Sequence, residues 1–391
     1  MKPARLLTLV AVAAGLGLWM PTAASAATHT VSPGDSIQAA IDAAAPGDTV
    51  KVLPGDYIEG APAGTAAAAI RITKSIKLVA KSKPSKNIRV RILPGPGQNH
   101  GILVEPANPG DPDVEKVMIK GFTVEGFPKN GIWLRHVNNF KILKNESINN
   151  LENGIWPTLS AKGSVKKNVS YGSEDSALWV EASEDVRVIK NELHHSPTGL
   201  EVTISKGIKI LKNNVHDNTI GIGLYHPSAA GMPSPYPYAE LGDWTVSGNH
   251  VHNNNHPNNA PPGSMSAELP PGGGILVLGV DNVTVTKNIV ENNGFFGIGV
   301  VDWCAAVADT AFDCTPNPPE TETAPDNVYV ALNTASSNGM TPPGGFFDLL
   351  AADLALLAPI IPIESPVGGT HICFEDNTFT TSALLTPVDC S

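Results

Sequence analysis

Basic residues are scarce in this 391-residue chain, which has 26 lysines and arginines against 37 aspartates and glutamates. Two of them, Lys2 and Arg5, precede an apolar run from Leu6 to Met20 and the small residues Ala24-Ser25-Ala26. This arrangement predicts a secretory signal peptide, residues 1–26, and its removal would change the net charge from −11 to −13. Such a surface disfavours nucleic acid and anionic membranes as partners. Any other polyanionic partner is disfavoured in the same way, unless a cation or a local basic stripe intervenes.

Long apolar runs are missing after the signal peptide. The most apolar later segment, residues 346–363 (FFDLLAADLALLAPIIPI), is too short and too often broken by proline to span a bilayer. Its leucines, among them Leu349, Leu350 and Leu354, predict a helix that folds back over the protein or closes its C-terminal end. The alternative is an apolar patch that docks a protein partner or touches a membrane.

Cysteine is also rare, and no two cysteines have the C-x-x-C spacing of a metal site. In an exported chain an even number of cysteines predicts disulfides, here two. Three pairings are possible, and the short loops they close favour Cys304–Cys314 and Cys373–Cys390. Glycine-rich stretches such as Gly294–Gly299 lack the order of a nucleotide-binding loop. The sequence therefore predicts no metal and no cofactor.

The chain does contain a repeat. Asn145, Asn168, Asn191 and Asn213 recur at intervals of 23, 23 and 22 residues, and Phe122 holds the same position one repeat earlier. Each repeat alternates apolar and polar residues with the period of a β-strand. A fixed period of this size predicts a solenoid, whose turns bury their apolar sides by stacking. Asparagine suits the sharp corners, because it tolerates left-handed backbone angles and its amide can bond to both neighbouring turns.

The repeat lengthens after residue 226, where Pro/Gly-rich insertions occupy residues 227–241, 257–274 and 305–324. Insertions of this kind map to loops, often on the binding face of a solenoid. At the other end, residues 36–44 predict a short amphipathic helix that caps the open core. The segment 27–391 is thus expected to be one domain.

These repeats resemble the right-handed parallel β-helix of the pectate-lyase-like superfamily, in particular its carbohydrate-binding and sugar-hydrolase type. The segment Pro33–Gly60 (PGDSIQAAIDAAAPGDTVKVLPGDYIEG) is similar to the usual start of such domains. The resemblance implies an all-β fold, a single-stranded solenoid with an N-terminal capping helix and long insertions in its C-terminal half. It also implies a secreted protein that binds a polysaccharide and acts on it as a lyase, hydrolase or epimerase. The polygalacturonase motifs NTD, DD and GHG and the DPHD string of alginate epimerases are absent. The rival class is a non-catalytic envelope or accessory protein that docks a protein partner.

Trp133, Trp156 and Trp179 share one outward position on three successive repeats. Arg135 and Tyr225 belong to a parallel column two residues further on. Aromatic rings beside hydrogen-bonding groups predict a substrate-binding platform for sugar rings. The alternative is that the tryptophans pack on one another or under an inserted loop.

Glu181 and Glu201 continue these two columns on adjacent turns. Their spacing suits the paired carboxyl groups of a glycosidase, although such pairs also arise by chance.

A second polar column, three residues after the asparagines, contains Tyr171, His194, His216 and His252, with Asp217 beside it. Stacked imidazoles can act as catalytic acids or bases or as metal ligands. The alternative is a solvated polar face.

Overall fold

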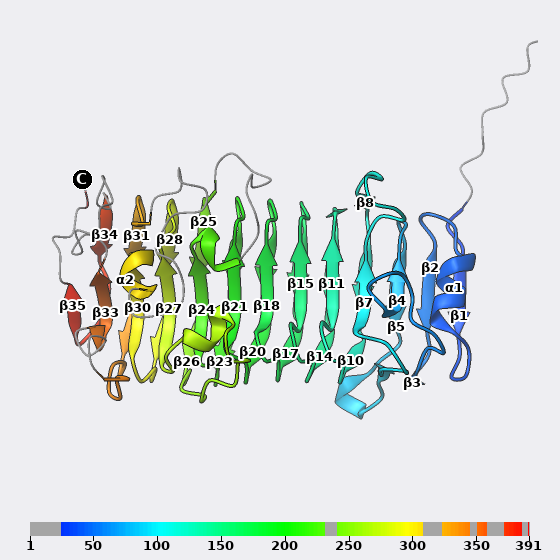
Figure 1. Ribbon diagram of the computed structural model, residues 1–391, viewed down its shortest axis with the longest axis horizontal. Coiled ribbons are helices and arrows are strands. Elements are labelled where there is room, and N and C mark those ends of the chain that lie inside the picture. The colour runs from blue at the N-terminus through cyan, green and yellow to red at the C-terminus, as the bar shows by residue number, and fades with distance from the viewer. Residues whose placement is uncertain are drawn as a thin grey trace, which may run out of the picture.

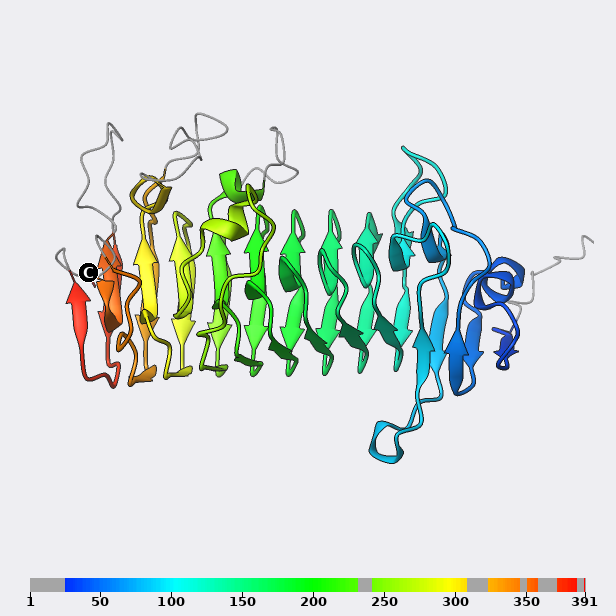
Figure 2. The same ribbon diagram turned by 60° about the horizontal axis from the view of Figure 1, so that its bottom comes forward.

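The computed structural model describes residues 25–230, 241–307, 323–344, 350–357, 371–384 and 390. The chain winds into a single elongated stack, and each turn adds one strand to each of three parallel sheets (Figure 1). This is the right-handed parallel β-helix that the sequence predicts. Figure 2 shows the regular rise of the turns from the N-terminal helix to the C-terminal strand. The predicted signal peptide lies outside the described residues, apart from Ser25 and Ala26.

Sheet A contains twelve strands among the described residues, in the order of the chain. They are β1 (Thr28–Val31), β2 (Thr49–Val52), β5 (Lys77–Ala80), β9 (Met118–Lys120), β13 (Lys141–Leu143), β16 (Ser164–Lys166), β19 (Arg187–Ile189), β22 (Lys209–Leu211), β25 (Trp244–Ser247), β28 (Val283–Thr286), β31 (Val328–Ala331) and β34 (Ile372–Glu375).

Sheet B follows sheet A within each turn and has ten strands in the described chain. They are β3 (Gly55–Tyr57), β6 (Val90–Ile92), β10 (Thr123–Glu125), β14 (Glu146–Ile148), β17 (Val169–Tyr171), β20 (Glu192–His194), β23 (Asn214–His216), β26 (His250–His252), β29 (Ile289–Glu291) and β32 (Thr334–Ser336).

Sheet C completes each turn with the longest strands, eleven of them within the described ranges. They are β4 (Ala68–Ile72), β7 (His100–Val104), β11 (Ile132–Arg135), β15 (Ile155–Thr158), β18 (Ser176–Glu181), β21 (Thr198–Thr203), β24 (Ile220–Tyr225), β27 (Gly273–Leu278), β30 (Phe296–Val301), β33 (Ala352–Leu357) and β35 (Ser382–Leu384). A small two-stranded pair, β8 (Val114–Glu115) with β12 (Val137–Asn138), lies outside the three sheets.

Inward side chains from all three sheets form one continuous apolar core along the axis. The column Ile142, Val165, Val188 and Ile210 illustrates it, since the register aligns these residues on successive turns and each is fully buried. The alternation of buried and exposed residues in the strands follows from the period of two along a β-strand. The repeat in the sequence therefore translates directly into stacked layers.

The predicted asparagine ladder is confirmed at the corner between sheets A and B. Asn168 donates from Nδ2 to Ile142 O (3.0 Å) and to Asn191 Oδ1 (2.9 Å), and Asn191 Oδ1 also accepts from the Asn168 backbone N–H (2.9 Å). The same bonds repeat from Asn145 through Asn213 and onward to Asn249. Each amide thus links two turns and leaves no buried polar group unsatisfied there.

A second ladder, which the sequence reading missed, runs along the corner between sheets B and C. Asn218, Asn254, Asn293 and Asn338 bond to one another in the same way. Ser196 takes this position one turn before Asn218, since its backbone N–H donates to Asn218 Oδ1 (3.2 Å). Because serine replaces asparagine in some turns, the period of this second ladder is hard to see in the sequence.

The N-terminal cap is the predicted helix, α1 (Ile37–Ala43). Ser36 begins it by accepting a hydrogen bond from the Ala39 N–H (3.0 Å), and Ile37 and Ile41 are buried against the core. The short 3-10 helices η1 (Pro84–Lys86), η2 (Pro227–Ala230) and η3 (Met265–Glu268) and the helix α2 (Trp303–Val307) belong to loops. No helix in the described part of the chain is long and apolar enough to cross a membrane.

The helix predicted within residues 346–363 is wrong where the structure describes the segment. Residues 352–357 form β33, which pairs with β30 and β35 in sheet C. Leu354 and Leu356 alternate into the core, and Leu350 and Leu357 pack on the outer side, so stacking against existing turns overrides the helical pattern. All four leucines are buried. Residues 346–349 and 358–363 lie outside the described residues.

One of the two predicted disulfides, Cys373–Cys390, is confirmed. It links β34 to the C-terminus. The described residues contain no free cysteine. The other predicted pair, Cys304 with Cys314, includes a residue outside the described ranges.

Candidate functional site

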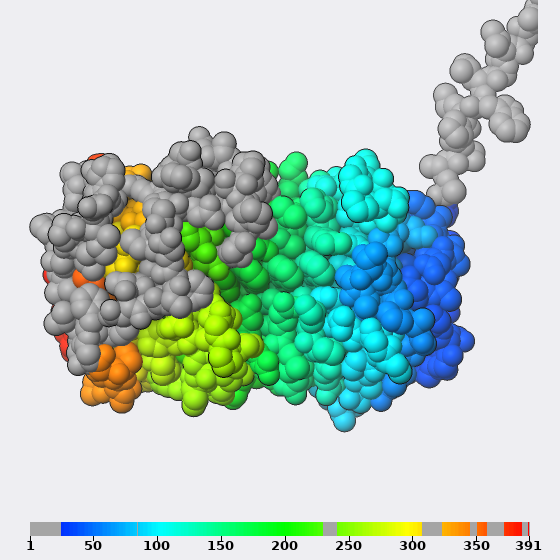
Figure 3. All heavy atoms as spheres, viewed as in Figure 1, coloured from blue at the N-terminus to red at the C-terminus, as the bar shows by residue number. Residues whose placement is uncertain are grey.

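The outer face of sheet C divides into an open half and a covered half. It faces the viewer in Figure 1, where β11, β15 and β18 are bare and α2 lies over β30. Around the later strands the inserted segments bury a second apolar cluster, which includes Leu276, Phe296 and Trp303 and is separate from the solenoid core. Figure 3 shows the described residues near 260 as a yellow-green mass beside the green turns. Leu269 and Met265 of the insertion 257–274 pack in this cluster, so the described part of that insertion lies on the face of sheet C.

The three tryptophans stand in one row on the open half. Strand register aligns Trp133 with Trp156, and the rings of Trp133, Trp156 and Trp179 stack with centroid distances of 4.9 and 5.2 Å and interplanar angles of 5° and 6°. Stacking at the spacing of the strands turns each ring face toward the next turn. The row therefore presents ring edges to the outside. The rings also pack on one another, as the alternative interpretation of this column states.

The indole N–H groups distinguish the two ends of this row. Trp179 Nε1 donates to Thr203 Oγ1 (2.9 Å), whereas Trp133 Nε1 and Trp156 Nε1 are buried without an acceptor at hydrogen-bonding distance. Burial raises the pKa of the Glu181 carboxyl group to about 7, and its interactions with Thr158 and Trp156 offset part of that rise. Buried donors without partners are uncommon in folded proteins.

The N-terminal end of the row is closed by charged groups. Arg135 lies over the Trp133 ring, 5.0 Å from its centroid, and forms an ion pair with the buried Glu105. Arg71 binds the other oxygen of Glu105 at 2.7 Å. His100 contacts Trp133 at 5.0 Å, and burial lowers its pKa to about 4, so it is neutral at ordinary pH. Arg135 is thus held in place by Glu105, while its side chain stays 37% exposed.

The C-terminal end of the row is occupied by buried carboxyl groups. Glu201 follows Trp179 in the same column, is 6% exposed, and accepts a hydrogen bond from Ser176 Oγ. Burial raises its pKa well above the ordinary value, and the nearby Asp175 raises it further. Glu181 is 4% exposed and accepts from Thr158 Oγ1 (2.9 Å), and burial raises its pKa to about 7.

Asp175 completes this carboxyl cluster, and the sequence reading missed it. It precedes β18, is half-buried, and accepts a hydrogen bond from Ser266 Oγ of η3, 91 residues further along the chain. Burial raises its pKa. Asp175 also raises the pKa values of Glu181 and Glu201 by electrostatic repulsion. The three carboxyl groups therefore interact, which is a common feature of catalytic sites.

Tyr225 is not the exposed substrate ligand that the sequence predicts. It is 3% exposed, and its hydroxyl lies 3.4 Å from Thr198 Oγ1. The ring folds back over Gly223, where a Cβ atom would lie 2.1 Å from the ring. Burial and the neighbouring Glu201 raise the pKa of Tyr225, so its hydroxyl stays protonated and forms a wall of the carboxyl cluster.

Glu181 should make the protein less stable as the pH rises. Its pKa is about 7 in the folded protein against an ordinary 4.5, so the folded state binds the proton more tightly. The stability from this group is complete below pH 4.5 and is lost as the pH rises through 7, a change of about 3 kcal/mol. In Glu181→Gln the side chain cannot ionise, and we expect a smaller fall in the free energy of unfolding between pH 5 and 8, measured in urea. The exposed Glu115→Gln is the control, and equal pH profiles for both variants would contradict the assignment.

The predicted histidine column is confirmed as a ladder on sheet B. Tyr171, His194, His216 and His252 stack at centroid distances of 4.5, 5.0 and 5.1 Å. Burial and neighbouring imidazoles lower the pKa of His194 to about 4 and also lower that of His252. His216 pairs with Asp217 (2.7 Å). Because this ladder lies on a different sheet, the structure does not bring its residues together with the carboxyl cluster.

The histidines do not form a compact metal site. Within the described ranges, the one group of three possible ligands whose donor atoms lie close together is Cys373, Glu375 and Cys390. Its two cysteines are bonded to each other and cannot serve as thiolate ligands. Two interpretations of the column then remain, catalytic acids or bases and a polar outer face.

The fold and this face define a parallel β-helix protein with a tryptophan row that leads to a buried carboxyl cluster. The chain belongs to the right-handed β-helix family, whose model, described as "Right handed beta helix region", matches residues 100–234 and 130–312. No curated protein matches the sequence.

Two solved structures illustrate the shared fold. The A-module of the mannuronan C-5 epimerase AlgE4 from Azotobacter vinelandii has a TM-score of 0.53 and 14% identity, covering 91% of this chain and 92% of that chain. DFA-IIIase from Arthrobacter chlorophenolicus A6, in complex with DFA-III, has a TM-score of 0.52 and 14% identity, covering 91% of this chain and 84% of that chain. At such low identity the likeness concerns the fold alone.

Proposed function

We propose that this protein is exported, binds a neutral polysaccharide along the tryptophan row of sheet C, and hydrolyses it at Asp175, Glu181 and Glu201. The observation that carries the proposal is the position of three interacting carboxyl groups with raised pKa values at the end of that row. Burying several acids together is costly, so such a cluster has a reason beyond stability. The predicted signal peptide supports export.

The carboxyl cluster contains the groups that glycoside hydrolysis requires. Glu201, whose burial raises its pKa well above the ordinary value, is the general acid: it gives its proton to the glycosidic oxygen as the bond to the anomeric carbon breaks. Asp175 is the least buried of the three, and in its ionised form it takes a proton from the attacking water. The water oxygen bonds to the anomeric carbon, and exchange with solvent restores both groups.

Neutral sugars suit this face better than uronates. Lyases and epimerases of uronates must stabilise a substrate carboxylate, but here the groups around the cluster are acids, and Arg135 lies at the other end of the row, where Glu105 holds it. A substrate carboxylate beside Asp175 and Glu201 would be repelled. The solved relatives include an enzyme bound to DFA-III, which supports a carbohydrate as the ligand class.

A polysaccharide panel tests the proposal. The secreted protein is incubated with neutral and anionic polysaccharides, and both retention and new chain ends are measured. Retention on a neutral chain with new reducing ends is the expected result. New unsaturated ends would show that the protein cleaves by elimination and not by hydrolysis. Binding without products would show a binding module without catalysis. The absence of any binding would favour the accessory-protein class.

Trp156→Ala should weaken both glycan binding and folding. The central ring contributes two stacking contacts, at 4.9 and 5.2 Å, and their loss is expected to cost about 1–3 kcal/mol of unfolding free energy. Loss of the apolar edge at the centre of the row should weaken glycan binding by roughly 1–2 kcal/mol. Trp156→Phe keeps a ring in the stack and is the matched control. Calorimetric titration with the retained glycan measures binding, and unchanged affinity in Trp156→Ala would remove the row from the binding site.

A further inference from the structure

Sheet A concentrates positive charge on one face of an otherwise acidic protein. The strand register places Lys141, Ser164, Arg187 and Lys209 in one outward column on four consecutive turns. Lys77 occupies the same column two turns earlier. The three lysines and the arginine are exposed. Cations therefore occupy four of six consecutive positions along the axis of the solenoid, and Met118 and Ser164 occupy the other two.

Further lysines border this column at both corners of the sheet. On one side, Lys116 and Lys162 are exposed and lie two residues before their strands. On the other side, a lysine precedes each of four consecutive asparagines of the first ladder, and each has a positive φ of 54° to 58°. These exposed corner residues are Lys144, Lys167, Lys190 and Lys212.

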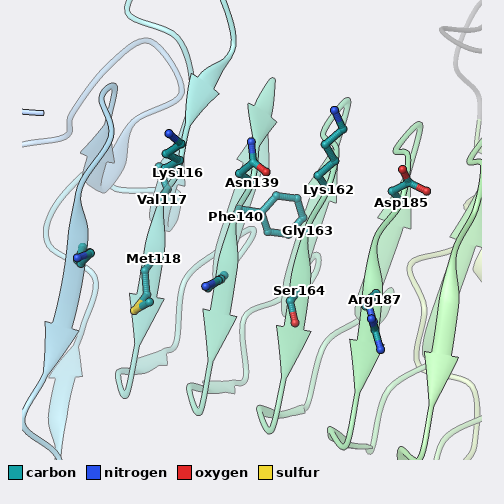
Figure 4. Close-up of a pocket in the computed structure, with 12 residues that line it drawn as sticks. Lys116, Val117, Met118, Asn139, Phe140, Lys162, Gly163, Ser164, Asp185 and Arg187 are labelled. Atoms are coloured by element: carbon teal, nitrogen blue, oxygen red, sulfur yellow. The ribbon is translucent and has the colours of Figure 1, made fainter. Parts of the chain in front are cut away.

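Part of this face is hollowed into a groove of about 620 Å³ (Figure 4). Among the described residues that line it, Asp185 is the one acid, against five lysines and arginines. Phe140 forms its floor, because Gly163 on the next turn leaves room for the ring: a Cβ there would lie 2.0 Å from it. The groove is thus shallow, basic and extended across several turns.

In the described chain, the cations of this face do not form ion pairs with the acidic residues of the protein. The ion pairs found in the described chain involve other residues, such as Arg71, Arg89 and Lys129, and none includes Lys141 or Arg187. Cations held apart in this way repel one another. An external anion that lies between them would relieve that repulsion.

We propose that this basic face of sheet A is a second glycan-binding surface, which holds a linear polysaccharide with an anionic group on successive sugars. From β5 to β22 the face spans five strand spacings of about 4.8 Å, or about 24 Å, which accommodates several sugar residues. The cations lie in straight columns with the period of the turns, so a straight chain along the axis can meet one after another. The surface is independent of the sheet C site, since it belongs to another side of the solenoid.

Two other polyanions fit less well. Single-stranded nucleic acid is bound by basic grooves that also offer aromatic rings to its bases, but Phe140, the one aromatic residue among the described lining residues, is buried. A bilayer is broad and flat, and it would also bring the acidic remainder of the protein, with its net charge of −11 for the whole chain, toward like charge.

A charge-reversal variant, Lys141→Glu/Arg187→Glu/Lys209→Glu, tests the surface. The matched control, Lys83→Glu/Lys86→Glu/Lys129→Glu, changes the net charge equally with exposed residues that lie off sheet A. Affinity electrophoresis in gels with polygalacturonate, chondroitin sulfate or neutral dextran measures binding. We expect wild type to be retarded by both anionic chains but not by dextran, with less retardation as salt is added. The reversal should weaken binding at least about tenfold, because three attractions become repulsions, whereas the control should stay close to wild type.

Several results would overturn this proposal. Unchanged retardation of the reversed variant, or equal losses in both triple variants, would show that the face is not the binding surface. Stronger binding to single-stranded DNA or to phosphatidylserine vesicles than to the anionic polysaccharides would assign it another partner. Circular dichroism of each variant establishes that its fold is intact, and hydrolysis of the neutral substrate of sheet C should be retained in both.

Discussion

Replacing Glu201 by glutamine is expected to lower the rate of polysaccharide hydrolysis by about 10²–10⁴-fold, the usual effect of removing a general acid. Glutamine keeps the shape of the side chain and can still accept from Ser176 Oγ, but it has no proton to give to the leaving oxygen. Because the buried carboxyl group is costly to ionise, the variant should be at least as stable as wild type at pH 8. Initial rates of reducing-end formation and urea unfolding curves provide the two measurements.

The control for this prediction is Glu192→Gln, which changes an exposed carboxyl group on sheet B. It should leave hydrolysis close to the wild-type rate. A Glu201→Gln protein that remains folded, binds the glycan and hydrolyses it at the wild-type rate would exclude Glu201 as the acid. Loss of binding together with activity would instead assign Glu201 a role in holding the substrate.

Asn168→Leu is expected to destabilise the protein by about 2–4 kcal/mol. The change removes the acceptor of the Asn145 backbone N–H and side chain, and it leaves Ile142 O without its donor. These groups are buried, so water cannot replace the lost bonds. Leucine also fits poorly at a polar corner. The free energy of unfolding in urea measures the effect.

Lys166→Leu is the matched control for the ladder variant. Lys166 lies outward on β16, in register with Leu143 and Ile189, so a leucine is already tolerated in that column. Its effect should stay within about 0.5 kcal/mol, as for most surface changes. If Asn168→Leu were no more damaging than this control, the corner bonds would contribute little to stability.

The repeat made the fold predictable because each turn has the same pattern of strands and corners. Asn145 and its successors mark one corner, the alternating residues mark the strands, and stacking follows from both. The strand Ala352–Leu357 escaped prediction because its leucines also fit a helical spacing. The neighbouring turns decide between helix and strand, because they offer a strand edge with which this segment can pair.

The sequence predicts which residues of the candidate site share a column, but not which groups surround them. Spacing alone places Trp133, Trp156 and Trp179 in one row and Glu201 behind them. It does not reveal that Tyr225 folds back over Gly223, or that Ser266 reaches Asp175 from a distant insertion. The raised pKa values arise from those contacts and from burial, which depend on how the loops return to the solenoid.

The end-to-end construction has a mechanical consequence. In the described chain each strand pairs only with strands of the adjacent turns, and a longer contact such as Ser266 with Asp175 stays within the middle of the stack. The molecule should therefore unravel one layer at a time from an end. At the N-terminus α1 seals the core, and at the C-terminus Cys373–Cys390 fastens the final strand of sheet A. Amide exchange should therefore be slowest in the middle layers, and reduction of this cystine should speed exchange in β34 before it affects β16.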